Sequence, residues 1–115
     1  MKKMANQALR YNEGKPKYSY IDLESFADTA KVLEFGAAKY ARDNWKLGLP
    51  VTSILDSTLR HISAIQRGEF LDPESGLPHH GHLGCNIMFL SYVMRHKPEH
   101  IDIEPILSAA EKYYE

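Results

Sequence analysis

The sequence lacks several features that mark specialised classes of protein. It has one cysteine, Cys85, which excludes a disulfide within the chain and argues against a cysteine-rich zinc site. Its longest apolar stretch, residues 87–93, is interrupted by Ser91 and is far too short to span a bilayer. The opening lysines are not followed by an apolar run, so there is no signal-peptide pattern. We therefore expect a soluble cytoplasmic protein with no membrane association.

A marked excess of charge is also missing. Fourteen Lys and Arg residues face fifteen Asp and Glu residues, for a net charge of −1, so a nucleic acid polymer is not an expected partner. The apolar fraction is ordinary and does not indicate disorder. The 115 residues predict a single domain over 1–115, whose small core leaves little margin of stability. A homo-oligomer, a dimer or a tetramer, is therefore expected.

The periodicity of apolar residues predicts an all-α fold, a compact bundle of about four helices. The helices are expected over residues 22–43, 51–67 and 78–96, with a short fourth helix from Pro105 to the tyrosine pair near the C-terminus. Residues 1–20 have no apolar period and predict a basic arm or loop. The first helix should bury Phe26, Ala30, Leu33, Ala37 and Tyr40, and the second should bury Val51, Ile54, Leu55, Thr58, Ile62 and Ile65. Gly36, inside the first helix, suggests close approach of another helix or a ligand.

A group of polar side chains occupies one side of the expected third helix. His79, His82 and Asn86 are spaced three and four residues apart, so they project together, and Leu90 and Val93 continue the same side. Buried imidazole and amide groups are costly unless they have hydrogen-bond partners. These three residues are therefore either satisfied within the fold or part of a ligand site.

Candidate metal ligands come from this helix, from the turn before it and from the first two helices. Glu34 has only small alanine side chains around it on a helical wheel, and a carboxylate in such a niche requires a cation, either a metal or a Lys or Arg side chain. His61 flanks the apolar side of the second helix. The predicted ligands of a divalent metal, which is Mg, Mn or another transition metal, are Glu34, His61, Asp72, His79 and His82.

Other residues have the chemistry to hold or hydrolyse a phosphate ester. Asp56 and Glu69 are the candidate bases, although an intrahelical pair with Arg60 is the favoured interpretation of Asp56. Trp45 can stack on a base or fill the core, and the lysines of the N-terminal arm can contact phosphate or simply be solvated. The predicted substrate-binding residues are Lys15, Lys17, Lys39, Tyr40, Asn44, Trp45, Arg60 and Asn86.

Several motifs in a fixed order resemble a known family. They are residues 10–17 (RYNEGKPK), 34–40 (EFGAAKY) with Asn44-Trp45, 59–61 (LRH), 67–69 (RGE), 72–79 (DPESGLPH) and His82-x-x-x-Asn86. Over residues 9–93 they resemble the dATP/dGTP diphosphohydrolase N-terminal domain family, which is common in bacteriophages and distantly similar to the all-α MazG-like pyrophosphohydrolases. In a phage protein the expected location would be the host cytoplasm.

The resemblance implies metal-dependent hydrolysis of a purine deoxynucleoside triphosphate to monophosphate and pyrophosphate. The chain departs from the MazG pattern, because the first helix offers Glu34 without companion glutamates and no glutamate lies three residues before Asp56. Histidine ligands in their place would favour Mn, Co, Ni or Zn over Mg. The alternative is a phage module that binds and sequesters a purine or signalling nucleotide without cleaving it.

Overall fold

The computed structural model describes residues 6–115 and contains four α-helices. They are α1 (Ala27–Lys39), α2 (Val51–Gln66), α3 (His79–His96) and α4 (Glu104–Tyr113). Short 3-10 turns lie at Tyr18–Tyr20, Leu23–Phe26, Asn44–Leu47 and Pro98–His100. Within residues 6–115 the extended backbone pairs only at an isolated bridge between Leu71 and Pro78. The predicted all-α class with four helices is confirmed.

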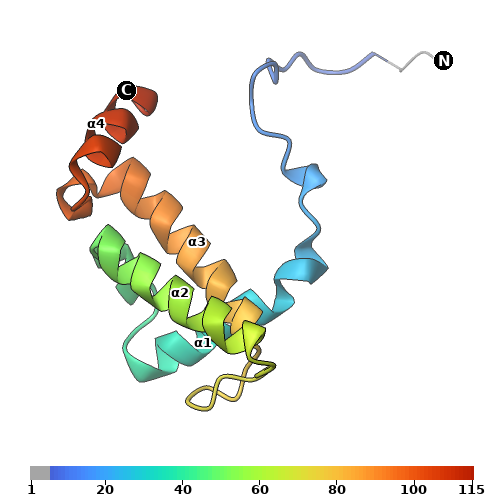
Figure 1. The fold of residues 1–115 in the computed structure, drawn as a ribbon. Helices are drawn as coiled ribbons and strands as arrows, with labels where there is room; N and C mark the ends of the chain where they lie inside the picture. The colour runs from blue at the N-terminus through green and yellow to red at the C-terminus, as the bar shows by residue number, and fades with distance from the viewer. Residues whose placement is uncertain (1–5) are drawn as a thin grey trace.

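Helix α3 is the central element of the fold. Helices α1 and α2 each pack along α3, and α4 contacts α3 near its C-terminal end (Figure 1). Helices α2 and α3 are antiparallel neighbours, joined by the turn that follows α2. No helix in residues 6–115 is both long and apolar enough to cross a membrane.

Helix α1 is shorter than the sequence pattern suggests, because both of its ends take other conformations. At the N-terminal end Asp22 accepts a hydrogen bond from the backbone N–H of Ser25, which stabilises a 3-10 turn rather than the first turn of an α-helix. At the C-terminal end the helix stops at Lys39, and Asp43 adopts a left-handed conformation with φ of 61°. The expected helix over residues 22–43 is therefore corrected to 27–39.

The face that α1 buries also differs from the predicted one. Thr29 and Val32 are buried against α3, whereas Phe26 and Tyr40 are 48% and 65% exposed. Contact is possible on the Thr29 side because α3 presents Gly81 there, and a Cβ at that position would lie 2.8 Å from the carbonyl oxygen of Asp28. Gly36 has open space around it instead, so the expected close approach of another helix is wrong, while the alternative, close approach of a ligand, stays a prediction.

The hydrophobic core lies at the end of the bundle away from the turn that joins α2 to α3. It is formed by Val51, Ile54, Val93, Ile101 and Ala110. The predicted buried face of α2 is thus right for its first turn but wrong further along, where Leu55, Ile62 and Ile65 are 36–43% exposed.

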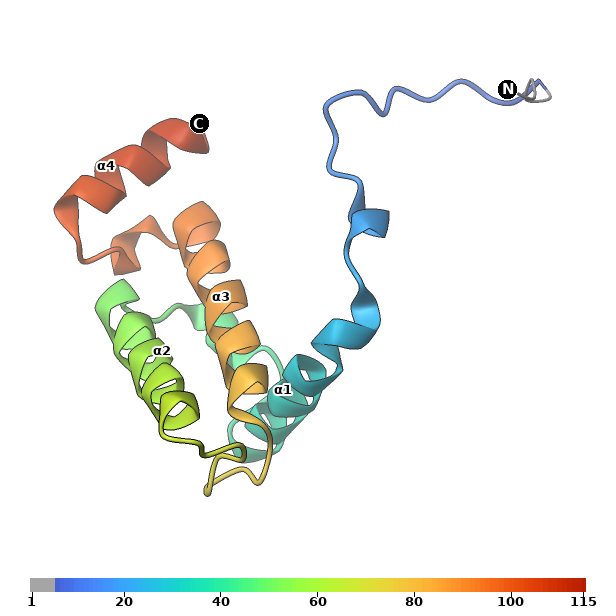
Figure 2. The same cartoon turned by 45° about the vertical axis from the view of Figure 1, so that its right-hand side comes forward.

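Residues 6–26 extend away from the helices. The radius of gyration is 18.0 Å, against about 13 Å for a compact domain of this length. In both views the N-terminal segment leaves the bundle at the start of α1 and runs outward (Figures 1 and 2). The predicted arm is therefore an exposed, extended segment, and a compact bundle describes only the part of the chain that follows it.

Candidate functional site

The turn between α2 and α3 is held in a defined shape by backbone hydrogen bonds. The N–H of Asp72 donates to the carbonyl of Leu77 at 2.8 Å, and the N–H of His79 donates to the carbonyl of Phe70 at 3.0 Å. The Asp72 carboxylate accepts a further hydrogen bond from the backbone N–H of Ser75 at 3.0 Å. These hydrogen bonds hold the Asp72 carboxylate close to the first residues of α3.

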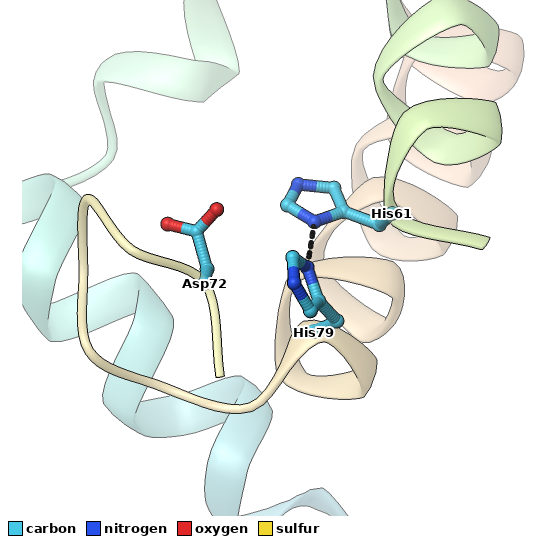
Figure 3. Close-up of side chains that lie close together, drawn as sticks. All are labelled: His61, Asp72 and His79. Carbon is cyan, nitrogen blue, oxygen red and sulfur yellow. Dashed lines mark hydrogen bonds between the residues drawn. The ribbon is translucent and has the colours of Figure 1, made fainter. Parts of the chain in front are cut away.

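Three of the predicted metal ligands meet at this point. Potential ligand atoms of His61, Asp72 and His79 all lie within 4.8 Å of one another. The two imidazole rings face each other through their Nδ1 atoms, which are 2.8 Å apart, and the Asp72 carboxylate lies beside them (Figure 3). His79 is almost fully buried, while His61 and Asp72 are half-buried. The cluster joins α2, the turn and the first residue of α3.

Glu69 is the partner that orients His79. Its Oε1 atom lies 2.8 Å from Nε2 of His79, so an N–H at Nε2 donates to the carboxylate. The Nδ1 atom of His79 then carries a lone pair directed at His61. A carboxylate on the far nitrogen of a ligand histidine is the usual arrangement around protein-bound metals, because it fixes the tautomer and the ring orientation.

His82 lies next to the cluster. Its ring stacks on that of His61 with 4.5 Å between centroids, and its Nε2 atom is 2.8 Å from Oγ of Ser75 and 3.7 Å from Oδ2 of Asp72. His82 therefore supports both His61 and Asp72. Its predicted role as a metal ligand stays a prediction, because the compact cluster contains only the other three residues.

The electrostatic environment keeps the two half-buried histidines neutral. Burial lowers the pKa of His61, and the neighbouring imidazoles of His82 and His79 lower it further. Burial also lowers the pKa of His82, although Asp72 acts in the opposite direction. Burial alone would raise the pKa of Asp72, but the hydrogen bonds from Ser75 outweigh it, together with the charge that His82 carries at the acidic pH where Asp72 titrates, and the pKa of Asp72 is lowered. Neutral imidazoles and an ionised carboxylate are the protonation states that metal binding requires.

The donor set of this cluster fits a divalent transition metal. Two imidazole nitrogens lie 2.8 Å apart beside a carboxylate, with the Nδ1–H of His61 donated to the Nδ1 lone pair of His79. An ion that replaced this proton would find both nitrogens and the carboxylate as donors. Mixed nitrogen and oxygen donors favour Mn, Co, Ni or Zn over Mg. An ion with three protein ligands also keeps positions open for a substrate or water.

The cluster forms part of the wall of a large open pocket of about 1200 Å³ between α1, α2 and α3. This is larger than the roughly 300–1,000 Å³ typical of small-molecule sites. All five predicted metal ligands line the pocket, as do Glu69 and six of the eight predicted substrate-binding residues, namely Lys39, Tyr40, Asn44, Trp45, Arg60 and Asn86.

Three predicted site residues lie elsewhere. Asp56 is exposed and does not line the pocket, and among the described residues it forms no ion pair with Arg60, the alternative expected for it. Lys15 and Lys17 lie in the extended N-terminal segment and do not line the pocket either. Their predicted roles in this pocket are therefore not supported by the geometry.

Glu34 is placed differently from the expectation that led to it. It lines the pocket from α1, but it is exposed rather than held in a buried niche, and it does not belong to the histidine–aspartate cluster. Because an exposed carboxylate is solvated, Glu34 does not require the cation that the helical wheel predicted for it. Its role as a ligand stays a prediction.

Two other predicted residues have partners within the protein. Trp45 stacks on Phe89 with 5.3 Å between ring centroids and meets Tyr92 edge-on, so it fills space between η3 (Asn44–Leu47) and α3. Asn86 is buried, and its Nδ2 atom donates to Oγ of Ser57 at 3.2 Å. Tyr40 is 65% exposed, and the Nζ atom of Lys39 lies 5.3 Å from the centroid of its ring. Its predicted role in stacking on a base stays a prediction.

Two residues of the turn were not among the predicted site residues. Ser75 holds His82 and Asp72 together, and Glu74, which lines the pocket, forms an ion pair with Lys39 that ties the turn to α1. The Asp-Pro-x-Ser pattern of a turn closed by its first side chain was a usable signal for Ser75. On α2, small or polar residues at helical spacing were another signal, since Ser53, Ser57, Arg60, Ala64 and Arg67 all line the pocket.

Comparison with known proteins identifies related sequences. The family described as "dATP/dGTP diphosphohydrolase, N-terminal" matches residues 5–103. A relative from Salmonella phage PMBT28, named dATP/dGTP diphosphohydrolase, is 32% identical over 90 residues. The aligned residues are 78% of this chain and 31% of the relative, so the chain spans about a third of that protein's length. No solved structure matches the chain.

Proposed function

Because the chain belongs to the dATP/dGTP diphosphohydrolase N-terminal family, we propose that it hydrolyses a purine deoxynucleoside triphosphate to the monophosphate and pyrophosphate with a divalent metal ion. The observation that carries this proposal is the cluster of His61, Asp72 and His79 in the wall of a large pocket that also contains cationic and aromatic side chains. A metal-bound nucleotide needs ligands for its ion, and it needs cationic and aromatic groups for its phosphates and its base.

The three residues of the cluster would hold the ion. When bound, a divalent ion neutralises phosphate charge and lowers the pKa of a water molecule. The protein prepares this site by keeping His61 neutral and Asp72 ionised at neutral pH. It also fixes the ring of His79 through Glu69, so that the nitrogen facing His61 needs no rearrangement.

The pocket offers groups for the remaining parts of a nucleotide. Arg60 on α2 and Arg67, the residue that caps its C-terminal end, are seven residues or about two helical turns apart, so they lie on the same face, and both line the pocket as phosphate-binding candidates. Lys39 faces them from α1, where its ion pair with Glu74 raises its pKa and keeps it charged. Tyr40 would stack on the purine base, since Trp45 is packed against Phe89.

Glu69 is the better of the two candidate bases. It lines the pocket beside the cluster, whereas Asp56 does not. Glu69 holds His79 through one carboxylate oxygen, and the second oxygen of a carboxylate can accept a proton from an attacking water.

A second function, nucleotide binding without cleavage, is favoured by one specific observation. The chain aligns with only 31% of its longer phage relative, so residues needed for turnover can reside in a part of that protein which this chain does not match. The pocket and cluster would then bind and sequester the nucleotide. The two functions share a site and differ in the fate of the ligand.

The deciding experiment incubates the chain with dATP, dGTP and their ribonucleotide counterparts in Mn²⁺ or Mg²⁺ and measures monophosphate and pyrophosphate. Turnover supports the enzyme, and stoichiometric binding of intact nucleotide supports the binding module. Asp72→Asn removes a charge while leaving the turn's acceptor oxygen, and we expect turnover to fall by about a hundredfold or more. Asp56→Asn makes the same chemical change outside the pocket and should leave turnover intact. Equal effects of the two substitutions would contradict the proposed site.

A further inference from the structure

Asn86 places a buried amide in the wall of the pocket, outside the metal cluster. The side chain projects from the middle of α3, is only 7% exposed and lines the pocket. Its Nδ2 atom donates to Oγ of Ser57 on α2 at 3.2 Å, while its Oδ1 atom accepts no hydrogen bond within residues 6–115. Every fully enclosed side-chain nitrogen and oxygen in that part of the chain has a partner. The Oδ1 atom is therefore not enclosed by protein, and it faces the pocket.

This oxygen is prepared to accept a hydrogen bond from a ligand. The bond from Nδ2 to Ser57 holds the plane of the amide, so that Oδ1 needs no rearrangement when a donor arrives. Polar atoms at this depth are costly without a partner. Water can serve in the free protein, but a ligand that displaces the water must restore the hydrogen bond or lose affinity. Oδ1 therefore favours a ligand that carries an N–H or O–H group at this point.

The position of Asn86 follows from the antiparallel packing of α2 against α3 (Figure 1). Nearest the turn that joins the two helices, His61 of α2 meets His79 and His82 of α3. The next contact along the pair is that of Ser57 with Asn86. Seven residues, or roughly 10 Å of helix, separate His79 from Asn86. A phosphate held at the metal cluster would leave this length for a sugar and place the base at Asn86.

The pocket becomes apolar beyond Asn86. Ile54 lies three residues before Ser57, Phe89 lies three residues after Asn86, and both line the pocket. Leu49, which also lines it, packs with Phe89 against the buried core that contains Ile54. Apolar walls with one placed polar group are typical of sites that bind a flat organic group in a fixed orientation. A heteroaromatic base has this combination, because its faces are apolar and its edge carries hydrogen-bonding groups.

We infer that Asn86 determines base specificity by accepting a hydrogen bond, through Oδ1, from an N–H group on the edge of a purine. Adenine offers its 6-amino group, and guanine offers N1–H and its 2-amino group. This inference rests on the proposed function, which places the phosphates at the metal cluster. The contact concerns recognition of the base and takes no part in the cleavage.

The test compares three nucleotides as α,β-methylene analogues, which cannot be cleaved at the proposed bond. They are the analogues of dATP, of purine 2′-deoxyriboside triphosphate, which lacks the 6-amino group, and of 2′,3′-dideoxy-ATP, which lacks the 3′-hydroxyl group. Titration calorimetry in Mn²⁺ gives the dissociation constants. The unmodified chain should bind the dATP analogue about tenfold more tightly than the purine analogue, as expected for one lost hydrogen bond to a buried acceptor.

Two substitutions assign this discrimination to Asn86. Asn86→Ala removes the acceptor, and Asn86→Leu removes it while keeping a side chain of similar size. In either variant with unchanged helicity by circular dichroism, the ratio should fall below about threefold because the dATP analogue binds more weakly. Asn44→Leu is the matched control, since Asn44 is an exposed asparagine that lines the same pocket. Whatever its effect on affinity, this variant should keep the tenfold ratio.

The outcomes separate this inference from the proposed function. Equal binding of the dATP and purine analogues by the unmodified chain would overturn the inference, and this result requires no variant. A ratio that survives both Asn86 substitutions, or that Asn44→Leu abolishes, would also overturn it. So would a loss at Asn86 that depends on the 3′-hydroxyl group instead of the amino group, because the amide would then contact the sugar. Absence of binding by all three analogues would overturn the proposed function together with the inference.

Discussion

The hydrogen bond between Glu69 and His79 predicts a measurable effect on metal affinity. Glu69→Gln keeps the size of the side chain but replaces a charged acceptor by a neutral amide, which holds the ring of His79 less firmly. Loss of such a supporting carboxylate typically weakens metal binding by roughly 10- to 100-fold. Because the Glu69 side chain is 42% exposed, water screens part of its charge, and we expect the lower end, about tenfold or ~1.4 kcal/mol.

Glu74→Gln is the control for the loss of charge alone. Glu74 lies on the same turn, is 64% exposed and pairs with Lys39 rather than with a histidine. Titration calorimetry with Mn²⁺ and Zn²⁺ should show about tenfold weaker binding for Glu69→Gln and less than about threefold for Glu74→Gln. Equal losses in the two variants would mean that bulk charge, and not orientation of His79, controls the site. Unchanged affinity in both would refute the assignment of the metal ligands.

Two further predictions concern stability. Gly36→Ala and Gly81→Ala should each favour the helix by about 1 kcal/mol through intrinsic propensity, but only Gly81 is crowded by the α1 backbone. In urea unfolding the Gly81→Ala variant should therefore be less stable than the Gly36→Ala variant by about 1–3 kcal/mol. Equal stabilities would contradict the close contact between α1 and α3. In metal-free buffer, the lowered pKa of His61 means that the unfolded chain binds more protons below pH about 6.5, so the free energy of unfolding should fall as pH drops through that value. His61→Gln should flatten this dependence, and a slope unchanged by the substitution would refute the assignment.

The positions of the helices were predictable because turn residues punctuate the sequence clearly. Pro50 precedes α2, Gly68 follows it in a left-handed conformation, and Pro78 precedes α3. The buried face of α1 was not predictable in the same way. Periodicity favours the side with the largest apolar residues, but the α3 glycines allow the backbone of α1 to approach on the Thr29 side instead.

The site was predictable wherever its geometry is helical. The three-residue spacing of His79 and His82 places both beside α2, and both line the pocket. The position of Asp72 depends on the path of the turn, which Ser75 and the backbone hydrogen bonds determine and which no periodicity describes. Glu34 was favoured because its wheel neighbours are small, yet small neighbours expose a side chain as readily as they enclose it.

The way the helices share contacts has a mechanical consequence. Helices α1 and α2 both pack along α3, and within residues 6–115 they make no comparable contact with each other. The angle between them is therefore set mainly through α3, and the ion pair of Lys39 with Glu74 adds a link between α1 and the turn that joins α2 to α3. A ligand that contacts Tyr40, at the C-terminal end of α1, and Arg60 on α2 would connect two helices that otherwise contact each other little. Fixing the angle between α1 and α2 would cost conformational entropy, and this cost would weaken the binding of such a ligand. A cross-link that holds the two helices at the angle of the bound state would remove the cost and tighten binding without adding a contact.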